Sequence, residues 1–242
     1  MKYDTIIIGA GLSGMAAGIR LAHYGKKVCI LEKHDRIGGL NSYFSRQGRN
    51  FDVGLHAMTN FTPRKKRRSP LNKLLRQLRI SRDDLQHCEH HESAIRFPDC
   101  TLRFSNDIEL LRSQVAEKFP EDASGFDRML DTIRQFTPGT PSGSKQTANV
   151  FFRNHLHDPL LVEMLREPVM YYGNPTPNDM NLDSFFTLFQ AIFLEGFCKP
   201  RDGIRTLLDV MHRRLIESGG ELRLKTPVNK LIHESGEVTG VQ

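Results

Sequence analysis

The first forty residues alternate between short apolar runs and glycine-containing turns. Thr5–Ile8 and Val28–Leu31 are apolar runs of strand length, and residues 12–24 between them carry apolar side chains three and four positions apart. Uninterrupted apolar runs are typical of parallel strands buried on both faces, and the wider spacing is typical of a helix. The pattern therefore predicts a β-α-β unit of an α/β fold, with its first strand inside the sheet.

The middle of the chain has a helical pattern. Apolar residues recur at helical spacing in segments 70–80, 106–119, 124–136 and 158–172, with short strands expected at 94–97 and 101–104 and a Pro/Gly/Ser loop at 138–145. Segment 185–197 is apolar nearly all round, which favours a core helix but also suits a substrate tunnel or a membrane surface. The last residues, around Ser235-Gly236, predict a β-hairpin.

These patterns divide the chain into three parts. Residues 1–62 form the first part of a nucleotide-binding domain, and the proline- and charge-rich stretch TPRKKRRSP then marks a break. Residues 63–195 are a mostly helical insert, and 196–242 return to the first domain. The expected fold is a Rossmann-like FAD/NAD(P)-binding domain with a mainly helical substrate-domain insert.

The turn after the first strand carries Gly9, Gly11 and Gly14 in the spacing GxGxxG. Such glycines allow a tight turn, close approach of a pyrophosphate and close helix packing, and the helix N-terminus attracts phosphate. Glu32 stands at the tip of the second strand, eighteen positions after Gly14. An acid there accepts hydrogen bonds from ribose hydroxyls and repels a 2′-phosphate, so FAD or NAD is expected and NADP is not.

Two longer blocks resemble a known family. GAGLSGMAAGIRLAHYGKKVCILEKHDRIGGLNS, followed by FDVG, is similar to the N-terminal signature of the flavin-containing amine oxidase and phytoene desaturase superfamily, nearest the phytoene desaturase, carotenoid isomerase and retinol saturase branch. KPRDGIRTLLDVMHRRLIESGGELRLKTPVNKLI resembles the segment of that family that returns to the flavin domain. Many relatives carry Arg at the position of Leu40 and Gly-Gly at Asp202-Gly203.

The resemblance implies FAD as the cofactor and a set of residues that hold it. The residues expected to bind its ADP half or lie beside it are Gly9, Gly11, Leu12, Ser13, Gly14, Glu32, Lys33, Gly38, Gly39, Leu40 and Val228. His56, in FDVGLH, is expected near the flavin, and a purely structural role for it is an equal alternative. No catalytic base is assigned.

Composition and charge bear on the location of the protein and on its binding partners. The formal charge is +6, four cysteines have no paired spacing, and no leader or membrane-spanning run is expected. The basic run at residues 64–68 lacks interleaved aromatics, which disfavours binding to nucleic acid. A solvated surface loop is the favoured interpretation of this run, and binding to lipid headgroups is the next. The His- and Glu-rich stretch at 87–92 lacks metal-site spacing. We expect a cytoplasmic protein, with peripheral contact to the inner face of a membrane as a further expectation.

The resemblance also implies a reaction. The first hypothesis is an FAD-dependent oxidoreductase that moves a hydride from a hydrophobic isoprenoid or polyene to flavin. An amine oxidase or protoporphyrinogen oxidase-like enzyme stays open, as does a non-catalytic nucleotide-binding fragment. Relatives are about twice as long, so we expect an N-terminal fragment that needs a C-terminal half chain, or that forms a homodimer, and that is inactive alone.

Overall fold

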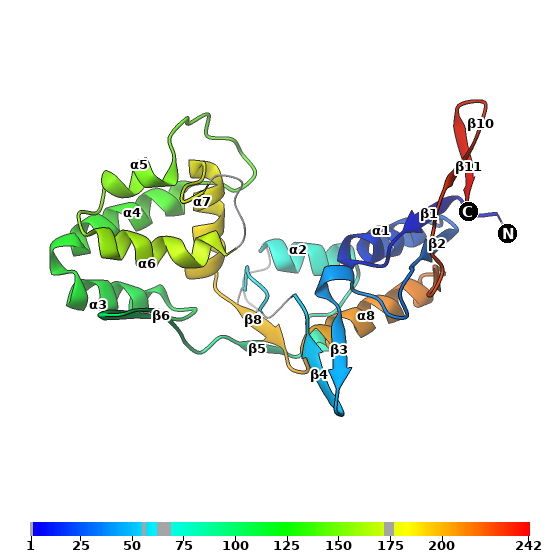
Figure 1. Ribbon diagram of the computed structural model, residues 1–242, viewed down its shortest axis with the longest axis horizontal. Coiled ribbons are helices and arrows are strands. Elements are labelled where there is room, and N and C mark those ends of the chain that lie inside the picture. Colours follow the sequence, from blue (N-terminus) through cyan, green and yellow to red (C-terminus); the bar gives the residue numbers. More distant parts are fainter. Residues whose placement is uncertain (1, 55–56, 62–68, 172–176) are drawn as a thin grey trace. The chain divides into compact units, whose positions relative to one another are not determined.

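The computed structural model describes residues 2–54, 57–61, 69–171 and 177–242, and the chain folds into two compact units (Figure 1). Unit 1 comprises Met1–Ala57, Pro70–Cys88 and Lys199–Gln242, and unit 2 comprises Met58–Ser69 and Glu89–Cys198. His56 and the basic run at 64–68 lie outside the described residues. The assignment of functional domains to residue ranges stays a prediction.

A three-stranded parallel sheet lies at the centre of unit 1. Its order is β1 (Thr5–Ile8), β2 (Val28–Leu31) and β9 (Glu221–Arg223). Thr5 pairs with Val28 and Ile8 with Leu31, and the helix α1 (Leu12–His23) connects the two strands. The predicted β-α-β unit and the α/β class are therefore confirmed.

The first strand is less buried than its composition predicts. All four residues of β2 are buried, but in β1 the side chains alternate, with Ile6 37% and Ile8 56% exposed. Within the described ranges β1 pairs only with β2, and Ile7 lies on the face that packs against α1, 3.3 Å from a Cβ built on Gly14. The prediction of an interior strand is wrong for the described sheet, in which β1 is an edge strand. An apolar run shows that a strand could be buried on both faces, but the other elements of the fold decide whether it is.

Two helices and two hairpins complete most of unit 1. Helix α8 (Ile204–Glu217) packs against α1, and a Cβ on Gly18 would lie 2.7 Å from Ile30 Cδ1 and 3.2 Å from Leu215 Cδ1, so a larger residue there would displace these side-chain ends. The other elements are α2 (Pro70–Gln77), the 3₁₀ turns Gly39–Asn41 and Asp83–Leu85, the hairpin β3 (Tyr43–Arg46) and β4 (Arg49–Asp52), the hairpin β10 (Leu231–Glu234) and β11 (Glu237–Val241), and the paired β5 (His87–Glu89) and β8 (Cys198–Pro200).

Unit 2 is mostly helical, as its apolar spacing predicts. Its elements are the hairpin β6 (Ser93–Phe97) and β7 (Cys100–Phe104), the helices α3 (Ile108–Lys118), α4 (Ala123–Gln135), α5 (Ala148–Arg153), α6 (Pro159–Met170) and α7 (Leu182–Phe189), the 3₁₀ turn Pro120–Asp122 and the π-helical turn Gln190–Leu194. Side chains at the N-caps of α3, α5, α6 and α7 accept backbone N–H groups. Each of these helices therefore starts at a position that its own sequence marks.

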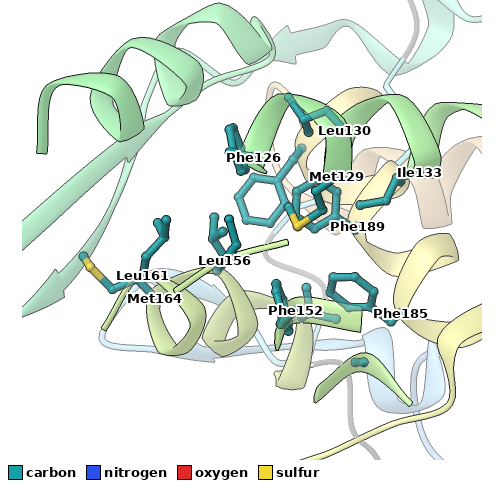
Figure 2. Close-up of a cluster of buried hydrophobic side chains, with 14 of the residues drawn as sticks. Phe126, Met129, Leu130, Ile133, Phe152, Leu156, Leu161, Met164, Phe185 and Phe189 are labelled. Carbon is teal, nitrogen blue, oxygen red and sulfur yellow. The ribbon is translucent and has the colours of Figure 1, made fainter. Parts of the chain in front are cut away.

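The core of unit 2 is aromatic. Phe185, Phe189 and Phe193 from α7 and the π-helical turn are at most 1% exposed, and Figure 2 shows Phe126 and Phe152 in the same cluster. The apolar segment that begins at Phe185 is thus core, which excludes a membrane-facing role for these three rings. Its one amide, Gln190, donates from Nε2 to the carbonyls at the end of α4, so the polar group is satisfied inside the unit.

No helix in the described part of the chain combines the length and the apolar character needed to cross a bilayer.

Candidate dinucleotide-binding site

The turn between β1 and α1 presents the uncapped end of a helix. Gly11 occupies the N-cap position with an extended backbone and no side-chain cap, and the Met15 N–H donates to its carbonyl at 2.9 Å. The N–H groups of Leu12, Ser13 and Gly14 therefore lie in the first turn, where a helix has no internal acceptors for them. Together with the helix dipole they favour an anion at this end.

Two glycines of this turn have different surroundings. A Cβ on Gly14 would clash with the carbonyl oxygen of Gly9, so the helix can approach the strand only if this residue has no side chain. A Cβ on Gly11 would meet nothing within 4 Å. Gly14 is thus needed for packing, whereas Gly11 borders open space next to the helix end, as expected where a phosphate would approach the backbone.

The carboxylate of Glu32 closes one side of the turn. It is 6% exposed, and its Oε2 accepts the Ala10 N–H at 2.7 Å while Oε1 accepts the His34 N–H at 2.9 Å. Burial raises the pKa of this carboxyl, but the hydrogen bonds from His34 and Ala10 outweigh it and the net pKa is lowered. The group is therefore ionised at neutral pH, and each oxygen retains capacity for another donor.

The glycine pair lies directly against the same turn. Gly38 forms an isolated parallel bridge with Gly11, and its N–H donates to the Ala10 carbonyl at 2.8 Å. Its φ of +114° is in the region that favours glycine, and a Cβ would lie 2.9 Å from Leu208 of α8. A Cβ on Gly39 would lie 3.3 Å from the Cα of Gly11. Two glycine segments that are separate in sequence, the turn after β1 and the Gly38-Gly39 pair, thus meet at one end of the sheet.

Three of the remaining predicted residues are more exposed than Glu32. Leu40 is 87% exposed, and Lys33 is also exposed. Val228 is half-buried and lies two residues after Thr226, whose N–H donates to the Glu32 carbonyl at 2.8 Å. The structure brings Val228 into the neighbourhood of Glu32 through the backbone, and the binding roles of all these residues stay predictions.

Asp52 is a positioning residue that sequence reasoning missed. Its side chain is 11% exposed, 3.2 Å from Lys199 Nζ and near the N-terminus of α8, where a Cβ on Gly203 would lie 2.5 Å from Oδ2. Two residues later, a Cβ on Gly54 would overlap the Leu40 carbonyl. The FDVG segment therefore fixes α8 and the turn after the glycine pair. The sequence carried no signal for this contact, because Asp52 and Gly203 are 151 positions apart.

No group of three or more His, Cys, Asp or Glu side chains within the described ranges is arranged to hold a metal ion. Within the His- and Glu-rich stretch at 87–92, the pKa values of His87 and His90 are both lowered, chiefly by burial.

Comparison with known proteins agrees with this geometry. A sequence family described as an NAD(P)-binding Rossmann-like domain matches residues 7–78. Prolycopene isomerase 1 of an Oncidium hybrid cultivar is 30% identical over all of this chain and 46% of its own length, and the neurosporene-forming phytoene desaturase of Cereibacter sphaeroides is 25% identical over 98% and 49%. The chain spans about half the length of these curated relatives.

Solved structures share the fold. The crystal structure of an oxidoreductase from Methanosarcina mazei aligns with a TM-score of 0.74 and 20% identity, covering 98% of this chain and 54% of that one. The resemblance inferred from the two sequence blocks is confirmed: the chain is similar along its length to phytoene desaturases and prolycopene isomerases, and its residues 7–78 match the NAD(P)-binding Rossmann-like domain.

Proposed function

We propose that the chain is the dinucleotide-binding part of an FAD-dependent oxidoreductase that acts on a hydrophobic isoprenoid or polyene. The observation that carries the proposal is the meeting of Gly11, Gly38 and the ionised, buried Glu32 at the open N-terminus of α1. The relatives that match along the chain are named for reactions of carotenoids, and this supports the substrate class.

The residues present fit the ADP half of FAD. The first-turn N–H groups of α1 would bind the pyrophosphate, the space beside Gly11 would admit it, and the remaining lone pairs of Glu32 would accept the ribose hydroxyls. The same carboxylate would repel the 2′-phosphate of NADP. Val228 would contact the adenine through its backbone. When bound, the flavin would supply the hydride acceptor, while this chain holds and orients the nucleotide.

The cofactor is tested with Glu32→Ala. Loss of charge-assisted hydrogen bonds of about 1.5–3 kcal/mol should weaken FAD about 10- to 150-fold. FAD affinity is measured by titration calorimetry, with NADP as the comparison ligand and Glu234→Ala, an exposed glutamate of the same unit, as control. If Glu32→Ala binds FAD as tightly as the parent and circular dichroism shows unchanged folding, the role of this acid is refuted.

The substrate class is tested on a completed enzyme. Because the chain spans about half of its relatives, residues 1–242 alone should give no product from phytoene, even with FAD and an electron acceptor. Supplying the polypeptide that corresponds to the other half of those relatives should restore turnover, detected by carotenoid chromatography. A product from residues 1–242 alone would contradict the need for a second half. Oxidation of an amine with no reaction of any polyene would favour the amine oxidase alternative.

A further inference from the structure

The hairpin β3–β4 of unit 1 has two unlike faces. Tyr43 pairs with Asp52, Phe44 with Phe51, and Arg46 with Arg49. Side chains alternate between faces along each strand, so Phe44, Arg46, Arg49 and Phe51 share one face, which we call the outer face. Figure 1 shows the hairpin extending away from the sheet and helices of unit 1.

The other face anchors the hairpin. Asp52 pairs with Lys199 at 3.2 Å, and the guanidinium carbons of Arg36 and Arg205 lie 5.6 and 5.7 Å from the centroid of the Tyr43 ring. Arg36 also donates to the Tyr43 carbonyl at 3.0 Å. Charged and cation–π contacts thus hold the inner face against the rest of unit 1, and the outer face is the opposite face of the hairpin.

The outer face combines exposed aromatic rings with two positively charged arginine side chains. Phe44 and Phe51 stack with centroids 5.2 Å apart and are 48% and 44% exposed, and Val53 continues this face at 51%. Arg46 and Arg49 are exposed beside the two rings at the turn. The hairpin's only acid, Asp52, is on the inner face and is paired. Aromatic and basic side chains side by side are the composition of surfaces that bind the interface of an anionic bilayer.

We propose that the outer face of β3–β4 docks on an anionic lipid surface, with Phe44, Phe51 and Val53 in the interfacial layer and Arg46 and Arg49 on headgroup phosphates. A lipid surface fits better than a protein partner because the charge on this face is of one sign and agrees with the chain's net +6. The inference deepens the proposed function, since a polyene is dissolved in the bilayer, but lipid binding itself needs neither flavin nor turnover.

The test is co-sedimentation of the 242-residue chain with two kinds of vesicle. One is phosphatidylcholine with about 30 mol% phosphatidylserine, which gives a strongly negative surface, and the other is pure phosphatidylcholine. The chain should bind the anionic vesicles, and Arg46→Gln/Arg49→Gln and Phe44→Ser/Phe51→Ser should each lower the partition coefficient at least about tenfold. Matched controls in α2 of the same unit are Lys73→Gln/Arg76→Gln and Leu74→Ser, since Leu74 is also 48% exposed. These should bind like the parent.

Several outcomes would overturn the proposal. They are equal binding to both vesicle types, equal loss in the α2 controls, or loss confined to a variant of the basic run at 64–68. Unchanged vesicle binding with reduced self-association in the phenylalanine variant would make the face a protein contact instead. If the phenylalanine variant fails to fold by circular dichroism, the arginine pair decides. FAD titration of the same variants should be unchanged, which separates this proposal from the cofactor assignment.

Discussion

Units 1 and 2 differ in what they leave on the surface. Among the described residues, every exposed large hydrophobic side chain except Tyr171 belongs to unit 1. The five largest fully buried side chains, all phenylalanines, belong to unit 2. Unit 2 therefore buries its own apolar residues, whereas unit 1 presents Ile6 and Ile8 on one face of its sheet. The difference shows which unit has apolar surface left for something else to cover.

The two units also use a buried carboxylate for different ends. Glu32 in unit 1 and Asp122 in unit 2 are 6% and 2% exposed, and each accepts backbone N–H groups that lower its pKa despite burial. Asp122 accepts the His157 and Asp158 N–H groups at 2.8 Å, so it ties two segments of the unit together. Glu32 differs because it borders an open glycine turn. A perturbed pKa marks a binding site only where space for a ligand adjoins it.

The largest expected effect is in the core of unit 2. Phe185→Ala should cost about 3–5 kcal/mol of unfolding free energy, because a fully buried ring is removed from a packed cluster. Phe44→Ala, at a half-exposed position of unit 1, should cost about 1 kcal/mol or less. Urea denaturation measures both. Equal costs would break the contrast between a self-contained unit 2 and an exposed unit 1.

Within unit 1, Gly14 and Gly11 differ in whether they are needed for packing or border the proposed ligand space. Gly14→Ala should destabilise the chain by about 1–3 kcal/mol, since its Cβ clashes with the Gly9 carbonyl. Gly11→Ala should cost about 1 kcal/mol or less, because its Cβ meets open space and only the N-cap preference for glycine over alanine is lost, yet it should weaken FAD binding. Thermal melts and FAD titration separate the two effects. A Gly11→Ala variant destabilised as strongly as Gly14→Ala would contradict the open space beside Gly11.

Acid should weaken unit 2 through Asp122. Its folded pKa lies below the ordinary value, so its contribution is present above the unfolded pKa of about 4 and is lost as pH falls through the folded pKa. Asp122→Asn should cost about 1–3 kcal/mol at pH 7 and flatten the decline of stability below pH ~4. Denaturant melts at several pH values measure this. A variant with the parent's full acid sensitivity would assign the decline to other carboxyls.

The smallest effect on stability is expected at β1. Ile6→Lys/Ile8→Lys should change unfolding free energy by about 0.5 kcal/mol or less, but it should reduce self-association of the chain. The exposed apolar face of β1, and its outer edge, which pairs with no further strand among the described residues, would otherwise promote contact between chains. Sedimentation velocity is the measurement, with Tyr24→Lys, at a 70% exposed position, as control. A parent chain that stays monomeric at high concentration would refute the association.

Local features of the chain were readable from sequence. The β-α-β unit, the helices α3, α4, α6 and α7 of unit 2 and the C-terminal hairpin follow from spacing and turn residues within a few positions, whereas the short helix α5 was not predicted. The approach of Glu32 to the glycine turn was also predictable, because a right-handed crossover places the ends of neighbouring parallel strands together. The family resemblance came from the same short stretches.

Contacts between distant segments were decided only by the tertiary structure. The exposure of Ile8, the attachment of α8 by Asp52 and the inclusion of α2 in unit 1 depend on residues far away in the chain. The apolar segment from Phe185 is core for the same reason, since its rings meet partners from α4 and α5. Sequence by itself determined which faces are apolar and where turns and helix starts lie, because these depend on neighbouring residues; what covers each face depends on packing, which is non-local.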